Sequence, residues 1–246
     1  MSDKNLVSRL FEAGSHFGFK KARRHPTVTP FLYATKEGSD VIDLAKTSES
    51  LIAAKDALKE AGSMGKTVLF VGTKDEVSKI VKAAAEKVEA PYVTNRWIGG
   101  MLTNWTEIKK RINRLETLTN EKTTGELDRK YTKKERVVIG REATKLEFNF
   151  FGISQMAKMP DLMVVVDPRH DSIAVSEATE KNIPVMAVMS TDGNASMIKY
   201  PVVANDALQT SVSLIVDELV AAFSEGKTAF VPKEAPAAGN TRRRTA

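Results

Sequence analysis

Cysteine is absent from the 246-residue chain. This absence excludes disulfides, thiolate-bound iron–sulfur clusters and a thiolate nucleophile, and it fits a reducing compartment. No apolar run approaches the roughly 18 residues that a membrane-spanning helix needs. Residues 1–5 do not begin a signal peptide. Together these absences predict a cytoplasmic protein that makes no contact with a membrane.

Nucleotide-binding and hydrolase motifs are also missing. Neither a P-loop nor a G-x-G-x-x-G fingerprint occurs, and no serine nucleophile elbow accompanies the Gly99-Gly100 step. The loop after the first apolar strand leads into Asp75, whose charge would repel a phosphate at that helix start. The three histidines lack the i,i+4 spacing of a zinc site. We therefore expect a protein that is not an enzyme and has no cofactor and no metal.

One polar corner keeps an enzymatic alternative open. Asp167 ends an apolar strand close to His170 and Asp171, and such a group could hold a metal or act as acid and base. The favoured alternative is a strand-end turn in which Asp171 or Ser172 caps the next helix. The sequence alone does not decide whether this corner holds a metal. Measuring the metal content of the purified protein would decide it.

Charge is distributed unevenly along the chain. The net charge is +6, but residues 1–25, 105–147 and 227–246 each carry +4, so the remaining chain sums to −6. A basic N-terminal arm, a basic insertion and a basic tail are thus attached to a neutral-to-acidic body. This arrangement predicts contact with a polyanion through the appendages. The alternative is charge that serves solubility alone.

Apolar runs alternate with amphipathic segments. Residues 68–71, 162–166 and 184–189 are short, uninterrupted apolar strands, the pattern of a parallel sheet covered on both faces. Weaker strands are expected at 92–93 and 201–203. Helices are expected at about 5–13, 48–61, 75–88, 172–181 and 207–223. The alternation predicts a doubly wound α/β body.

Two further features complete the predicted body. Residues 31–34 and 41–44 are expected to form a hairpin. Thr47 or Ser48 is expected to cap the helix that follows. The predicted domains are a discontinuous body, a helical insertion and a disordered basic tail: 1–104 with 158–226, 105–157, and 227–246.

The insertion has two apolar seams at helical spacing. The first is Trp105, Ile108, Ile112 and Leu115. The second, in a helix expected from about Tyr131, is Ile139, Ala143, Leu146, Phe150, Ile153 and Ala157. Alternating steps of three and four residues are typical of a coiled coil. We therefore expect an antiparallel coiled-coil hairpin that projects from the body.

A basic loop is expected over residues 16–26. Its Lys20, Lys21, Arg23, Arg24 and His25 suit contact with phosphate. The two phenylalanines beside them, at 17 and 19, are expected to turn inward, although stacking on bases is the alternative.

Residues 94–105 contain both tryptophans of the chain. Trp105 continues the first seam, which makes it the packing anchor of the hairpin, while Trp97 is undecided between core and nucleic acid. Gly99 and Gly100 allow a sharp turn from the sheet into the hairpin. The polar residues Arg96 and Asn104 are expected to face RNA.

This stretch also carries a family resemblance. Residues 96–105, R-W-I-G-G-M-L-T-N-W, resemble the signature of ribosomal protein two of the small subunit. Matches continue in order at 13–18, 42–47, 70–74, 160–168 and 205–207, so the resemblance covers about residues 5–224. Residues 190–201 depart from the family's usual asparagine-cysteine-aspartate run, and Gln209 or Thr210 replaces a usual arginine. Residues 19–25 are more basic than usual and lack a tryptophan.

The resemblance implies a non-enzymatic RNA-binding component with a flavodoxin-like domain and an inserted coiled-coil hairpin. It implies small-subunit ribosomal RNA and other small-subunit ribosomal proteins as partners, including the messenger-RNA-binding protein one that bacterial members help to recruit. It also implies a location in the small ribosomal subunit, near the junction of head and body. The length and the missing transit peptide suggest a bacterial member.

Electrostatic docking on folded RNA is the expected mechanism, because no RRM, KH or zinc-knuckle motif is present. A protein-interaction scaffold that binds no RNA is the other alternative. The predicted RNA-binding residues are Lys20, Lys21, Arg23, Arg24, His25, Arg96, Asn104, Lys109, Lys110, Arg111, Arg114, Arg129, Lys130, Lys133 and Lys134.

Overall fold

The computed structural model describes residues 2–230. A five-stranded parallel sheet forms its centre, in the order β5-β4-β6-β7-β8. The strands are β4 (Val68–Val71), β5 (Tyr92–Val93), β6 (Leu162–Val166), β7 (Val185–Met189) and β8 (Tyr200–Val203). Numbered along the sheet's own strands, this order is 2-1-3-4-5, which is that of flavodoxin-like folds. The predicted α/β class is therefore confirmed.

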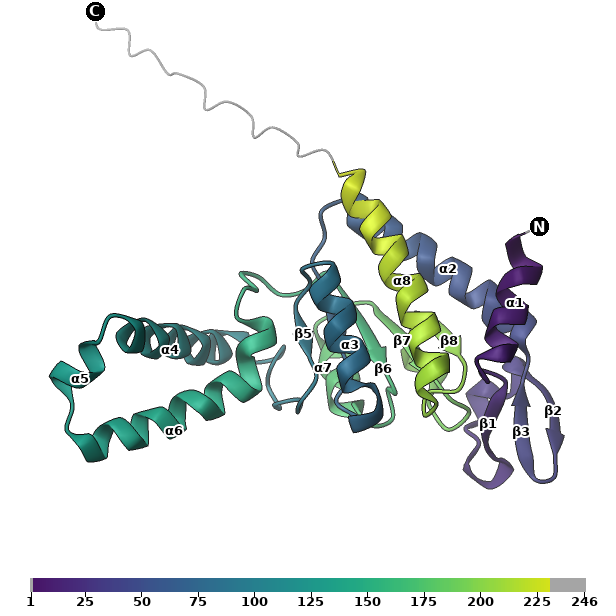
Figure 1. The fold of residues 1–246 in the computed structure, drawn as a ribbon. Helices are drawn as coiled ribbons and strands as arrows, with labels where there is room; N and C mark the ends of the chain where they lie inside the picture. Colours follow the sequence, from purple (N-terminus) through teal and green to yellow (C-terminus); the bar gives the residue numbers. More distant parts are fainter. Residues whose placement is uncertain (1, 231–246) are drawn as a thin grey trace, which may run out of the picture.

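Helices cover both faces of this sheet (Figure 1). On one face, alternate strand residues such as Phe70 and Val164 pack with α1 (Ser2–Glu12), α2 (Leu44–Ser63), α3 (Asp75–Lys87) and α8 (Gln209–Thr228). On the other face, Leu69, Val71 and Val165 pack with α7 (Ser172–Glu180). Because successive strand residues point to opposite faces, each apolar run supplies both cores.

A second sheet has three short antiparallel strands in the order β1-β3-β2. β2 (Leu32–Lys36) and β3 (Ser39–Ile42) form the expected hairpin. β1 (Phe17–Lys20) was not predicted, since its residues were expected to form a loop. The inward orientation expected for Phe17 is wrong, because 58% of that residue is exposed, whereas Phe19 is half-buried.

Two helix ends differ from the prediction. Helix α2 begins at Leu44, four residues before the expected start at 48, because the Asp43 carboxylate accepts a hydrogen bond from Ala45 N at 3.0 Å. Thr47, an expected cap, instead lies inside α2 and donates to Val203 O at 2.6 Å. Helix α8 continues to Thr228, past the expected start of the tail at 227. The rest of the predicted tail, 231–246, lies outside the described residues.

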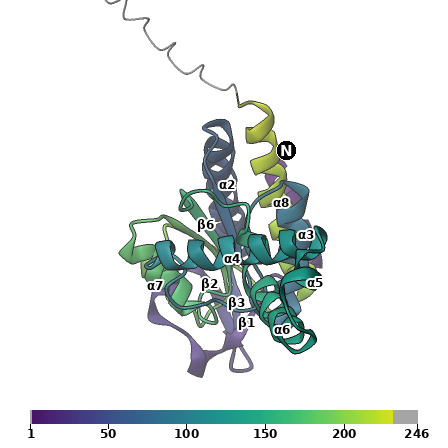
Figure 2. The same ribbon diagram turned by 90° about the vertical axis from the view of Figure 1, so that its left-hand side faces the viewer.

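The insertion forms a two-helix arm that extends away from the sheet (Figures 1 and 2). It consists of α4 (Trp105–Thr123), the short α5 (Glu126–Lys130) and α6 (Lys133–Phe150). The seams face each other, because Ile108, Ile112 and Leu115 are buried in the same cluster as Ile139, Leu146 and Phe150. The helix ends at Phe150, so the expected seam residue Ala157 is exposed and Met156 is buried in its place.

The arm shares its core with the body. The apolar cluster that lines the α7 face of the sheet continues through Trp97, Met101 and Leu102 into α4 and α6. The small sheet lies at the opposite end of the body from the arm (Figure 1). No helix within residues 2–230 is long and apolar enough to cross a membrane.

Candidate nucleic-acid interface

A buried glutamate holds the junction between the body and the arm. Glu177 of α7 accepts five hydrogen bonds from the segment that leads into α4. The donors are Trp97 Nε1 at 3.1 Å, the backbone N–H groups of Gly100, Leu102 and Thr103 at 2.8, 2.9 and 3.0 Å, and Thr103 Oγ1 at 3.1 Å. Trp97 is thereby placed in the core and does not face solvent.

These hydrogen bonds decide the charge of Glu177. Burial alone would raise its pKa, but the donors from Thr103, Trp97, Leu102 and Gly100 outweigh burial and hold the pKa below its ordinary value. The carboxylate is therefore ionised at neutral pH and attracts every nearby donor. Sequence reasoning missed Glu177, whose only signal is an acidic side chain between the buried Val175 and Ala178 of α7.

The turn into the arm needs glycine at one position. Gly100 has φ +88°, a left-handed conformation that glycine adopts without strain, whereas Gly99 has a negative φ and open space where a Cβ would lie. Trp105 is half-buried and packs against the shared cluster, as expected of a packing anchor. Arg96 and Asn104, the two residues expected to face RNA, are both exposed.

The basic residues predicted on the arm all lie on its exposed surface. Some of them form ion pairs with neighbouring carboxylates: Lys110 with Glu107 at 2.6 Å and Arg114 with Glu142 at 3.4 Å. Surface pairs of this kind contribute little stability and exchange readily for other anions. The exposed set is Lys109, Lys110, Arg111, Arg114, Arg129, Lys130, Lys133 and Lys134.

The N-terminal basic residues divide into those that are exposed to solvent and those that bind other residues of the body. Lys20 and Lys21 are exposed, and Arg23 lies over the Phe19 ring at 4.7 Å. Arg24 does not fit the predicted phosphate contact, because two nitrogens of its guanidinium donate hydrogen bonds to the buried Asp40 carboxylate. That contact holds the pKa of Asp40 below its ordinary value.

His25 is also engaged internally. Its ring nitrogen Nδ1 lies 2.8 Å from Thr27 Oγ1 and accepts from Thr27 N at 3.4 Å, at the start of the 3-10 helix Pro26–Phe31. The predicted basic loop therefore presents Lys20, Lys21 and Arg23 to solvent. These residues and the arm lie at opposite ends of the molecule and do not form one patch (Figure 1).

Replacing Arg24 with alanine tests its structural role. The substitution leaves a buried carboxylate without its cation, so we expect the thermal midpoint to fall by roughly 5 °C. Arg23→Ala is the matched control, since Arg23 is exposed and the carboxylate near it, Asp192 at 3.7 Å, keeps a second cation, Arg169 at 2.5 Å. Thermal unfolding followed by circular dichroism measures both variants. Equal midpoints for the two would contradict an internal role for Arg24.

Sequence comparison identifies the relatives of this chain. The family model described as Ribosomal protein S2 matches residues 10–226. The chain belongs to the ribosomal protein S2 family. Across 228 residues it is 39% identical to the protein named small ribosomal subunit protein uS2c of Rhodomonas salina, with 93% of each chain covered. It is also 39% identical to the uS2 protein of Helicobacter hepaticus over 219 residues. These residues make up 89% of this chain and 83% of the relative.

The resemblance read from residues 96–105 is thus confirmed. A third relative, the uS2 protein of Nostoc punctiforme, is 37% identical over 221 residues, or 90% of this chain. In this S2-family chain Glu177 binds the segment that carries the resemblance. Through these hydrogen bonds Trp97, Gly100 and Leu102 orient the arm.

The polar corner of this S2-family chain is internally paired. Asp167, with φ +64°, accepts from Lys74 Nζ at 3.2 Å. The Asp171 carboxylate accepts from Thr73 Oγ1 at 2.6 Å and Thr73 N at 3.2 Å, so it does not cap α7 as expected. Burial raises the pKa of Asp171. Within residues 2–230 no three histidine, aspartate or glutamate side chains gather as metal ligands do.

Next to this corner, Asp206 was overlooked as a titratable group. It is 1% exposed, its Oδ2 accepts from Ser190 N at 3.2 Å, and its Oδ1 has no hydrogen-bond partner. Burial, followed by the charge of Asp167, raises its pKa to about 7, while Lys74 acts in the opposite direction. A carboxyl group that changes charge near neutral pH therefore lies beneath the carboxyl ends of the strands.

Proposed function

We propose that this chain is a structural component of the small ribosomal subunit that binds ribosomal RNA through its basic appendages. The relatives are named as small-subunit proteins, and the family is one of ribosomal structural proteins rather than enzymes. The observation that carries the RNA-binding part is the location of charge. Exposed lysines and arginines concentrate on the arm and near the N-terminus, while residues 148–226 are net acidic.

The mechanism is rigid presentation of these charges. Phosphate contacts supply affinity by releasing counterions, and the distance between contact points supplies recognition of a folded RNA. The buried Glu177 and the shared apolar cluster fix the direction of the arm relative to the sheet. RNA segments that meet Lys20 and Lys21 at one end must also meet the arm at the other, so shape is read over the length of the molecule.

The acidic half of the body is proposed to face protein neighbours. These are other small-subunit ribosomal proteins, among them the messenger-RNA-binding protein one that the resemblance implies. Asp161, Asp217 and Glu225 belong to the acidic stretch that supports this contact. The affinity of a basic protein partner for this acidic surface would fall strongly as the salt concentration rises.

Neutralising the arm tests the proposal. A variant with Lys109, Lys110, Arg111 and Arg114 all changed to glutamine should bind small subunits depleted of this protein more weakly. Its slope of log K against log salt should be shallower by up to roughly 3.6, because each of the four lost phosphate contacts removes about 0.9 units. Binding is followed by co-sedimentation at several salt concentrations.

A matched variant controls for net charge. Lys36, Lys66, Lys181 and Lys199 are exposed lysines of the body, and changing all four to glutamine removes the same charge. This control should keep the wild-type slope. If both variants lose the same slope, general attraction of the basic chain explains binding and the arm is not the contact surface.

A further inference from the structure

Helix α6 carries an apolar row that does not face α4. The buried seam runs through Ile139, Leu146 and Phe150, but Val137, Phe148 and the following Phe151 are 52%, 60% and 58% exposed. The two exposed aromatic side chains at the end of this row, Phe148 and Phe151, indicate a contact surface rather than a core. Because α6 already pairs with α4 through the other row, this second row is free for an external partner.

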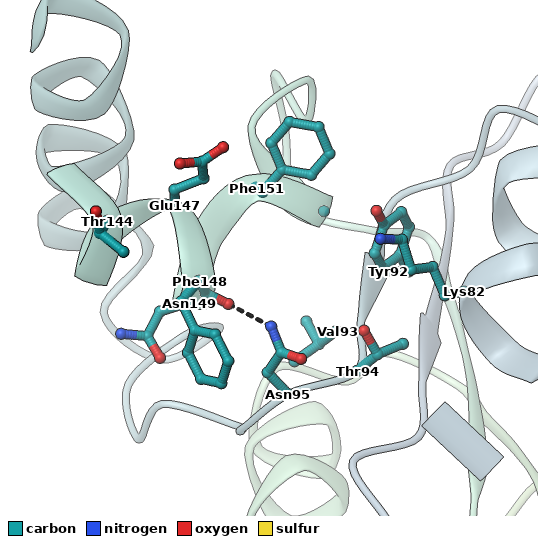
Figure 3. Close-up of a pocket in the computed structure, with 11 residues that line it drawn as sticks. Lys82, Tyr92, Val93, Thr94, Asn95, Thr144, Glu147, Phe148, Asn149 and Phe151 are labelled. Carbon is teal, nitrogen blue, oxygen red and sulfur yellow. Dashed lines mark hydrogen bonds between the residues drawn. The ribbon is translucent and has the colours of Figure 1, made fainter. Parts of the chain in front are cut away.

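The row ends in a pocket between the base of the arm and the sheet edge. The pocket has a volume of about 390 Å³. Phe148 and Phe151 lie on its arm side, and Tyr92 and Lys82 lie on its sheet side (Figure 3). The volume falls within the range of small-ligand pockets and accommodates one heterocyclic base. The polar groups that could bind the edge of such a base belong to Thr94, Thr144, Asn95 and Asn149.

The walls of this pocket are fixed by contacts across the junction. Asn95 Nδ2 donates to Phe148 O at 2.6 Å, which ties the end of α6 to the segment after β5. Gly152 lies so close to β5 that a Cβ there would be 2.2 Å from Tyr92 O. Tyr92 OH donates to Glu86 at 3.2 Å. These contacts hold the backbone that carries Phe148 and Phe151 against β5, and they hold the Tyr92 ring, before any partner arrives.

Positive charge continues from the pocket along the arm. A shallow groove beside it shares Thr144 and Phe148 and is lined by Lys122, Arg141 and Lys145. Gly140 leaves open space in this groove, where no atom lies within 4 Å of a Cβ position, so a backbone can approach closely. With Lys82 the two hollows present four cations against one acidic side chain, Glu147.

We propose that this pocket receives one unpaired base of the ribosomal RNA, with the adjoining phosphates lying along the α6 groove. A flat apolar group beside phosphates is the chemistry of a nucleotide, and stacking on aromatic rings is how proteins take unpaired bases. An acidic peptide would satisfy the cations but would leave the two exposed phenylalanines, Phe148 and Phe151, without a flat partner. The inference rests on the proposed RNA binding and names a contact separate from the basic residues of α4.

The test compares a single-stranded RNA with a duplex of equal charge. The single strand is an unstructured 12-nucleotide RNA containing 2-aminopurine, whose fluorescence reports stacking. Phe148→Ala with Phe151→Ala should weaken binding of the single strand by roughly 10-fold or more, since base stacking contributes about 1–3 kcal/mol per base. Quenching of 2-aminopurine should be lost, and duplex affinity and the salt slope should be unchanged.

Tyr33→Ala is the matched control, because Tyr33 is an exposed aromatic residue of β2, 78% exposed and at the far end of the molecule. It should bind both RNAs as the wild type does. Since Phe148 and Phe151 are exposed, the double variant should unfold at the wild-type temperature, which circular dichroism checks. Unchanged single-strand affinity overturns the proposal, as does an equal loss for duplex and single strand. Wild-type protein that binds neither short RNA also overturns the base-pocket proposal, whereas the proposed function fails only if the protein does not bind depleted small subunits.

Discussion

Replacing Glu177 with alanine is expected to lower the free energy of unfolding by about 5 kcal/mol. The side chain accepts five hydrogen bonds, and all of their donors lie in the segment from Trp97 to Thr103. Each buried donor left without a partner costs about 1–3 kcal/mol, and only some of them can reach water after the change. The loss should exceed that of any single substitution on the arm surface.

Urea unfolding followed by circular dichroism measures this effect. Glu180→Ala is the matched control, because Glu180 lies on the same helix and is exposed. Glu177→Gln should be intermediate, since its amide oxygen accepts while its amide nitrogen opposes the remaining N–H donors. A loss of less than about 1 kcal/mol for Glu177→Ala would contradict the role assigned to this residue.

Acid should reproduce part of the same loss. The pKa of Glu177 is held below its ordinary value, because the hydrogen bonds outweigh burial. A depressed pKa contributes stability that is present above the unfolded-state pKa and is lost as pH falls through the folded-state pKa. Wild-type protein should therefore lose stability below about pH 4, and Glu177→Gln should lose less over the same range.

Changing Asp206 to asparagine is expected to stabilise the protein at alkaline pH. The folded-state pKa of Asp206 is raised to about 7 from an ordinary value of 3.8. Between these values the folded state keeps a proton that the unfolded state releases, so stability falls as pH rises through this window and then levels off. Above pH 7 this shift lowers the free energy of unfolding of the wild type by about 4 kcal/mol, a loss that Asp206→Asn does not suffer.

The surroundings of Asp206 set the direction of this effect. Burial and the charges of Asp167 and Asp192 disfavour its ionised form, while Lys74 and the N–H of Ser190 favour it. Lys74 stays protonated throughout, because its own pKa is raised: burial lowers it, but the charges of Asp206 and Asp167 outweigh burial. The lysine therefore moderates the effect without reversing it.

Parallel urea titrations at pH 5 and pH 8 measure the difference. The gap between Asp206→Asn and the wild type should widen toward pH 8 in favour of the variant. Asp56→Asn serves as the control, since Asp56 is an exposed aspartate of α2 and should follow the wild type at both values. A gap that does not change with pH would show that Asp206 is ionised in the folded protein at both values.

The sequence specified the parallel sheet and the arm well, because both depend on local periodicity. The runs at 68–71 and 162–166 are long enough and apolar enough to be read as buried strands, and the seams from Ile108 and Ile139 fix which helix faces meet. The exposure of the arm cations follows from the same seams.

Features that depend on distant partners could not be read in this way. Glu177 meets its donors across 74 to 80 positions of sequence, and nothing local distinguishes it from an exposed glutamate. Arg24 looked like its neighbour Arg23 until Asp40 was brought beside it by the β1–β3 pairing. Strand β1 has only four residues and no buried side chain, so it depends on pairing with β3 beside it.

The hydrogen bonds to Glu177 also set an order of events during synthesis. The arm helices and the signature segment leave the ribosome before α7, since Thr103 precedes Glu177 by 74 residues. Until α7 is made, the turn at Gly100 lacks its acceptor and the arm has no fixed direction. A nascent or truncated chain that lacks α7 therefore carries the basic residues of the arm without holding the arm in its final direction. If the arm docks on ribosomal RNA as proposed, only a chain that has completed α7 presents the arm cations in the geometry that docking needs.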